Sequence, residues 1–113
     1  MCTRSELNTI LSELAKSYRA TYGNRLSKII LYGSYARGDF RDDSDIDVAA
    51  IVKGSRPELQ DELKQVWDRA NDLELEYEVL VSPTVIPFDE YEKWKEDLPY
   101  YRNIEREGVA VSG

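Results

Sequence analysis

The sequence predicts an α/β (α+β) protein with a small mixed three-stranded sheet flanked by helices. Helix-like and strand-like segments alternate along the chain, and no linker, repeat or low-complexity segment interrupts them. A chain of 113 residues, 42% of them hydrophobic, is long enough for one compact domain and too short for two. We therefore expect a single domain over residues 1–113.

A first helix is expected over residues 5–22, where apolar side chains recur at spacings of three and four. Thr3 and Glu6 are placed to form a capping box at its start. Gly23 supplies the residue type that commonly ends a helix.

Three further helices are expected downstream. One covers residues 57–71, with Pro57 in its first turn and Trp67 in the core. Another covers residues 88–95, and a short one ends before Gly108.

Three segments have the pattern of strands. Residues 27–32 and 45–52 are mostly apolar runs typical of buried strands. Residues 73–81 alternate, with leucine, tyrosine and valine facing one way and glutamates the other. Pro83 and Pro87 are expected to end this third strand.

The composition excludes several classes of mechanism and location. Because the chain has no histidine, it has no imidazole base and no histidine metal ligand. Its one cysteine, Cys2, cannot form an internal disulfide, which suits a reducing cytoplasm. No apolar run approaches the ~20 residues needed to span a bilayer. We expect a soluble cytoplasmic protein with no membrane partner.

The charge is unevenly distributed along the chain. Residues 1–57 hold 9 bases and 7 acids, whereas residues 58–113 hold 6 bases and 15 acids. This acidic half repels nucleic acid, so we expect no direct nucleic-acid binding. It serves either solubility alone or the docking of a basic partner.

One cluster of residues carries chemistry. Gly33 and Ser34 follow the first strand, and after ten intervening residues Asp45 and Asp47 begin the next. Aspartates at i and i+2 on a strand point to the same face, where their charges repel each other. A divalent cation removes this conflict, and oxygen ligands favour Mg²⁺ or Mn²⁺ over zinc.

The Gly33-Ser34 turn suits phosphate binding, because a glycine brings backbone N–H groups close to phosphate oxygens and the serine hydroxyl adds a donor. Arg37 and Arg41 are placed to neutralise a polyphosphate. The alternative is an ordinary turn followed by a solvated acidic loop. The placement between two strands favours the phosphate site.

Residues 33–39 and 44–47 (GSYARGD and SDID) resemble the signature of the DNA polymerase beta superfamily of nucleotidyltransferases, in its minimal single-domain form. The similarity covers nearly the whole chain, including the tail at residues 101–108. It implies a polymerase-beta-like fold in which two aspartates and a third carboxylate hold two Mg²⁺ ions. It also implies an antitoxin that transfers AMP from ATP to a tyrosine of a HEPN-domain ribonuclease toxin.

The third carboxylate departs from that pattern. The family usually places an aspartate in a later apolar strand, whereas this sequence offers Glu74, Glu76 and Glu78. Glu78 is our choice because it lies deepest in the expected strand. The alternative is an exposed acidic strand face without a metal.

The expected function is Mg²⁺-dependent nucleotidyl transfer from ATP. The expected catalytic and metal-binding residues are Asp45, Asp47 and Glu78, and the expected phosphate-binding residues are Gly33, Ser34 and Arg37. A small-molecule acceptor, and a non-catalytic acidic module that neutralises a toxin by occlusion, are the alternatives. The oligomeric state, homodimer or hetero-oligomer, stays open.

Overall fold

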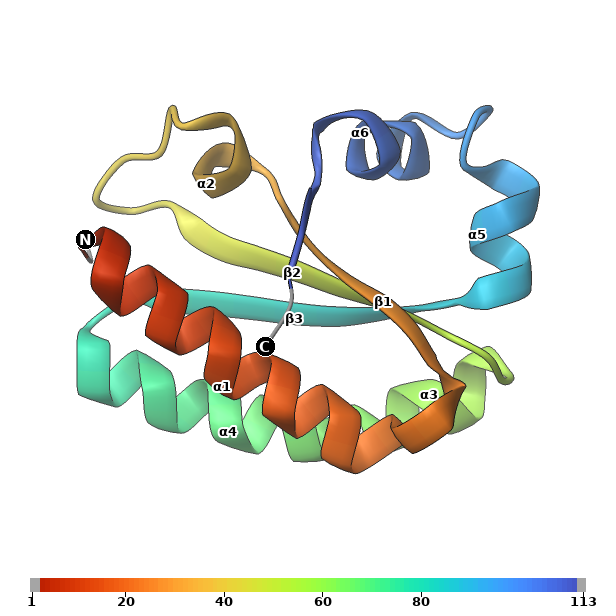
Figure 1. Ribbon diagram of the computed structural model, residues 1–113, viewed down its shortest axis with the longest axis horizontal. Helices are drawn as coiled ribbons and strands as arrows, with labels where there is room; N and C mark the ends of the chain where they lie inside the picture. The colour runs from red at the N-terminus through yellow and green to blue at the C-terminus, as the bar shows by residue number, and fades with distance from the viewer. Residues whose placement is uncertain (1–2, 112–113) are drawn as a thin grey trace.

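The structure is a computed structural model that describes residues 3–111. Its centre is a four-stranded sheet in the order β3-β2-β1-β4 (Figure 1). The strands are β1 (Leu26–Tyr32), β2 (Asp45–Val52), β3 (Leu80–Pro87) and β4 (Val109–Ala110).

The sheet is mixed. β1 pairs antiparallel with both β2 and β4, while β2 and β3 run parallel. The predicted fold class is confirmed, and the number of strands is one higher than predicted. The additional strand, β4, has only two residues, too few to leave an alternating pattern in the sequence.

Helices cover both faces of the sheet (Figure 1). They are α1 (Arg4–Tyr22), α2 (Ser34–Arg37), α3 (Arg56–Glu62), α4 (Lys64–Tyr77), α5 (Phe88–Trp94) and α6 (Pro99–Glu107), with a short 3-10 turn at Gly23–Arg25. One hydrophobic core lies between the sheet and the helices α1, α3 and α4. A smaller core lies on the opposite face, against α5 and α6. No helix of residues 3–111 is long and apolar enough to cross a membrane.

The ends of α1 confirm the helix signals in the sequence. Thr3 and Glu6 form the capping box: each side chain accepts a hydrogen bond from the backbone N–H of the other residue. Gly23 terminates the helix at a φ of 59°, a conformation that favours glycine.

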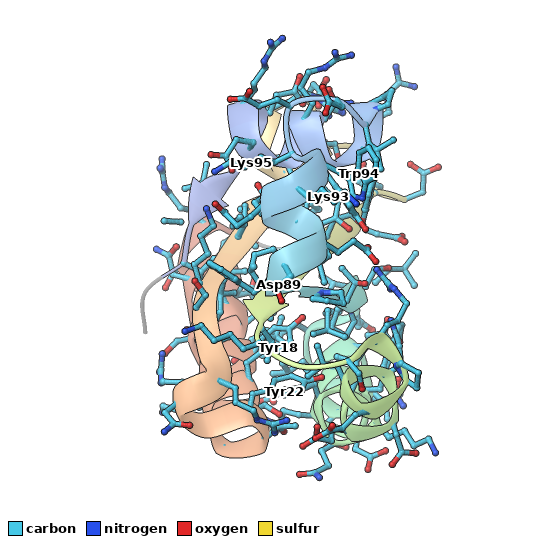
Figure 2. The ribbon with its side chains drawn as sticks, turned by 90° about the vertical axis from the view of Figure 1, so that its right-hand side faces the viewer. Tyr18, Tyr22, Asp89, Lys93, Trp94 and Lys95 are labelled. Carbon is cyan, nitrogen blue, oxygen red and sulfur yellow. The ribbon has the colours of Figure 1, made fainter. Side chains whose placement is uncertain are left out.

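Two tyrosines of α1 connect that helix to the rest of the fold (Figure 2). The buried hydroxyl of Tyr18 donates a hydrogen bond to the carbonyl of Thr84 at 2.8 Å, and that of Tyr22 donates to the carbonyl of Leu59 at 2.7 Å. Burial raises the pKa of both phenols, so they stay protonated and keep these bonds.

The predicted third strand over residues 73–81 is wrong. The chain is helical to Tyr77, and the strand runs over Leu80–Pro87. The helical spacing of Val66, Ala70 and Leu73 buries these side chains, whereas Leu75, which the alternating pattern placed on a buried face, is 83% exposed.

The prolines do not end the strand but belong to it. β3 lies at the edge of the sheet, and Pro83 and Pro87 fall within its eight residues. Proline is tolerated on an edge strand because its missing N–H can face away from the neighbouring strand.

The helix predicted over residues 57–71 is two helices, α3 and α4, which meet at Leu63. Trp67, predicted to lie in the core, is 40% exposed. It follows the buried Val66 in sequence, and successive residues of a helix point about 100° apart.

Candidate active site

The sequence cluster assembles at one end of the sheet, where β1 ends and where β2 and β3 begin (Figure 1). After β1, the chain turns at Gly33 into the short helix α2 and returns through a loop to Asp45. Three segments that are separate in the sequence therefore contribute residues to one surface.

Position 33 requires a glycine for two reasons, the backbone conformation and the neighbouring side chain of Asp47. Its φ of 76° and ψ of −157° belong to a region that is essentially restricted to glycine. A β-carbon at this position would also clash with the carboxylate oxygen Oδ2 of Asp47. The backbone of the turn thus lies directly against one of the two predicted metal ligands.

Asp45 and Asp47 project from the same face of β2, and both are half-buried. Burial and the charge of Asp45 raise the pKa of Asp47, and the charge of Arg37 partly opposes this. Burial is the larger of the two causes, so the raised pKa reflects first a carboxylate that is partly removed from water and second its charged neighbour.

No ion pair between residues 3–111 includes Asp45 or Asp47. Half-buried carboxylates without a cationic partner suit a hard divalent cation such as Mg²⁺. The chain's own residues therefore fit the metal that the sequence predicts. However, the described residues contain no group of three or more acidic, histidine or cysteine side chains arranged to hold a metal ion.

The structure adds Ser82 to this site. Ser82 lies opposite Asp47 in the parallel β2–β3 pairing, and its hydroxyl donates a hydrogen bond of 2.9 Å to Oδ2 of Asp45. Sequence reasoning missed this residue because it ended the third strand too early. The alternation of Val81, Pro83 and Val85 with polar Ser82 was the signal available in the sequence.

None of the three glutamates considered for the third carboxylate lies in a strand. Glu78 follows α4 in a left-handed conformation with a φ of 53° and is exposed. Glu76 lies on an exposed part of α4, and Glu74 accepts a hydrogen bond of 2.8 Å from the backbone N–H of Val81. The premise for choosing Glu78, a place inside a strand, is wrong.

The remaining predicted residues flank the carboxylates. Ser34 begins α2 beside Gly33 and is half-buried. Arg37, in the last turn of α2, is exposed and contacts the carboxylates of Asp39 at 3.3 Å and Glu107 at 3.4 Å. These surface contacts are weak enough to be exchanged for phosphate oxygens.

Two tyrosines form a wall on the same face. Tyr32 pairs with Asp47 across β1 and β2, and its hydroxyl lies 2.8 Å from that of Tyr100 in α6. Burial and this hydrogen bond, together with the nearby charge of Asp47, raise the pKa of Tyr32. The site thus has a neutral aromatic border toward α6.

A cavity of about 630 Å³ lies on the other side of α2, between α1 and β4. Arg37 and Gly38 line it, but Gly33 and the two aspartates do not. The carboxylates therefore lie outside this cavity.

Paired carboxylates on a sheet beside a glycine-serine turn are the arrangement that the sequence analysis expected of a nucleotidyltransferase. The chain belongs to the nucleotidyltransferase domain family, which it matches over residues 6–111.

Relatives agree with this class. Two proteins of Methanocaldococcus jannaschii, both assigned as protein adenylyltransferases, are similar to the chain. One is 36% identical over 71% of this chain and 79% of its own length. The other is 32% identical over 89% of this chain and 93% of its own length.

Two solved structures share the fold. A minimal nucleotidyltransferase superposes with a TM-score of 0.57 at 20% identity and covers 91% of this chain and 90% of its own. A toxin-antitoxin crystallised with AMP-PNP superposes with a TM-score of 0.56 at 19% identity, covering 91% of this chain and 73% of its own.

Proposed function

We propose that this chain is a Mg²⁺-dependent adenylyltransferase that moves AMP from ATP to a tyrosine of a HEPN-domain ribonuclease toxin and thereby acts as its antitoxin. The observation that carries this proposal is the pair of half-buried carboxylates, Asp45 and Asp47, packed against the Gly33-Ser34 turn. The adenylyltransferase relatives and the toxin-antitoxin neighbour support the acceptor class.

The residues have separable roles in the proposed reaction. Asp45 and Asp47 would hold Mg²⁺, which supplies charge neutralisation at the phosphates. The turn at Gly33 and the hydroxyl of Ser34 would bind phosphate oxygens, joined by Arg37 once it leaves its surface partners. Glu78 has no assigned role in this proposal because the structure does not group it with the aspartates.

The transfer itself is a displacement at the α-phosphorus of ATP. The acceptor's phenolic oxygen bonds to that phosphorus, the bond to the β-phosphate oxygen breaks, and pyrophosphate leaves. The phenolic proton passes to water. Gly33 and the two aspartates do not line the cavity beside α2, so we place the acceptor on another protein and not in a small-molecule pocket of this chain.

The second candidate is a non-catalytic module that neutralises a toxin by occlusion. α4 favours this reading, because it exposes Trp67 (40%) and Leu75 (83%) among acidic side chains such as Asp68 and Asp72. An apolar side chain bordered by acids suits contact with a basic protein surface.

One experiment separates the two functions. The full chain is incubated with a purified HEPN-domain toxin, ATP and Mg²⁺, and the intact mass of the toxin is measured. We expect a gain of one AMP unit, which the Asp45→Asn, Asp47→Asn double variant abolishes. The Asp42→Asn, Asp43→Asn variant is the matched control, because it removes the same charge from the exposed loop. A toxin that is neutralised without a mass gain would support occlusion and contradict transfer.

A further inference from the structure

The β3 strand presents a hydroxyl where it meets the two aspartates. Ser82 is in register with Asp47, and parallel strands in register turn their paired side chains to the same face. Its Oγ donates a hydrogen bond of 2.9 Å to Oδ2 of Asp45. Ser82 is half-buried, so this bond is partly shielded from competing water.

This bond restricts how Asp45 can turn. An aspartate carboxylate has a broad torsional range about its last bond, and a fixed donor on one oxygen selects an orientation. The other oxygen, Oδ1, has no hydrogen bond within the described residues. A partner that orients a metal ligand in this way typically changes metal affinity by about 10- to 100-fold when it is removed.

The strand that could supply a third carboxylate supplies none. Glu74 is engaged by the N–H of Val81, and Glu78 lies beyond α4 in an exposed cap. Across residues 3–111 the aspartate pair has no third acidic neighbour placed for metal binding. The chain thus offers two carboxylates and one neutral hydroxyl.

The number of carboxylate ligands then limits the number of cations. Two divalent ions in a shared site lie about 3.5–4 Å apart and carry four positive charges between them. Asp45 and Asp47 are the two carboxylates that the described residues place for metal binding, and the ATP phosphates complete the ligands of the ion that they contact. A second ion at this site would lack a carboxylate of its own from this chain.

We propose that Ser82 is a positioning residue that fixes Asp45 for one divalent cation, and that this chain with its nucleotide holds one cation and not two. The proposal rests on the nucleotidyltransferase function proposed above and specifies its metal site.

The test is a Mn²⁺ titration of the full chain with a non-hydrolysable ATP analogue, in which electron paramagnetic resonance detects free Mn²⁺. The unaltered chain is expected to bind one ion. Ser82→Ala is expected to bind one ion about tenfold more weakly, and Ser82→Thr, which keeps the hydroxyl, is expected to restore the affinity. Ser82→Asp adds the missing third carboxylate and is expected to bind a second ion.

Thr84→Val is the matched control. Thr84 lies two residues further along β3 on the same face, and its side-chain hydroxyl makes no hydrogen bond within the described residues. Its replacement should leave Mn²⁺ affinity unchanged. Thermal unfolding of each variant identifies any that fail to fold, and if Ser82→Ala is among them, the number of ions bound by Ser82→Asp carries the comparison with the unaltered chain.

Two ions bound to the unaltered chain, or an unchanged affinity in Ser82→Ala, would overturn the inference while leaving the proposed function intact. Absence of both Mn²⁺ and nucleotide binding in the unaltered chain would overturn the proposed function, and the inference with it.

Discussion

The two ends of β2 differ in the surroundings of their side chains: one end is charged and half-buried, and the other is apolar and buried. At its start, Asp45 and Asp47 are half-buried carboxylates without an ion-pair partner among residues 3–111. At its other end, every residue from 48 to 52 is buried and apolar. The same strand thus stabilises the fold at one end and carries two like charges close together at the other. Substitutions at the two ends should therefore have opposite effects on the free energy of unfolding.

The largest effect is expected at the buried end. Ile51 is fully buried against α5 and α6, and Ile51→Ala removes buried hydrocarbon and leaves a cavity. The free energy of unfolding should fall by about 2–5 kcal/mol, measured by urea denaturation. Affinity for a Mg²⁺-bound ATP analogue should stay unchanged in the folded variant. A loss of affinity as large as the loss of stability would show that the two ends are not separable.

A smaller cost in stability and a large loss of binding are expected at Gly33. In Gly33→Ala, the backbone conformation is strained and the new β-carbon displaces the carboxylate of Asp47. We expect about 1–3 kcal/mol of destabilisation and no measurable binding of the nucleotide analogue by calorimetry.

Gly38→Ala is the control for that prediction. Gly38 also has a positive φ, 87°, but a β-carbon there would meet no atom within 4 Å. It should lose stability through strain alone and keep nucleotide binding. Equal binding by the Gly33→Ala and Gly38→Ala variants would contradict the close approach of Gly33 to Asp47.

The smallest effect, of opposite sign, is expected for Asp47→Asn without metal. The pKa of Asp47 is raised in the folded state by burial and by Asp45, so its ionisation opposes folding. The stability of the unaltered chain should therefore fall as the pH rises through that raised pKa, and that of the variant should not. At neutral pH the variant should be more stable by at most about 2 kcal/mol.

Denaturation in EDTA at a series of pH values measures this difference. The stability advantage of Asp47→Asn should vanish at acid pH, where the carboxylate is protonated in both states. Saturating Mg²⁺ with nucleotide should reverse the order, because only the unaltered chain binds the metal strongly. A variant less stable than the unaltered chain in EDTA at neutral pH would contradict the repulsion between the carboxylates.

The parts of the fold that were predicted correctly are those whose structure is determined by residues close together in the sequence. The capping box of Thr3 and Glu6 and the boundaries of β2 depend on neighbouring residues and are confirmed. The stretch from Leu73 to Val81 satisfies both a strand and a helix pattern, and only packing of α4 on the sheet decides between them. The prediction that Trp67 lies in the core was wrong for the same reason: which side of α4 is buried depends on how that helix packs on the sheet.

The candidate site also has one part that local sequence signals predict and one part that depends on long-range packing. The approach of Gly33 to Asp47 follows from residues at the ends of two consecutive strands, so their spacing predicts a shared location. Ser82 depends on the register between β2 and β3, which are joined by two helices. A one-residue change in that register would turn Ser82 to the opposite face, and no local pattern fixes it.

The prolines of β3 have a consequence for how another molecule can approach the sheet. Two of the eight residues of β3, Pro83 and Pro87, are prolines. The prolines have no N–H, and Glu74 already accepts the N–H of Val81, so three residues of β3 offer no amide to an added strand. With β4 only two residues long at the opposite edge, neither border of the sheet is a template for strand addition or edge-to-edge aggregation.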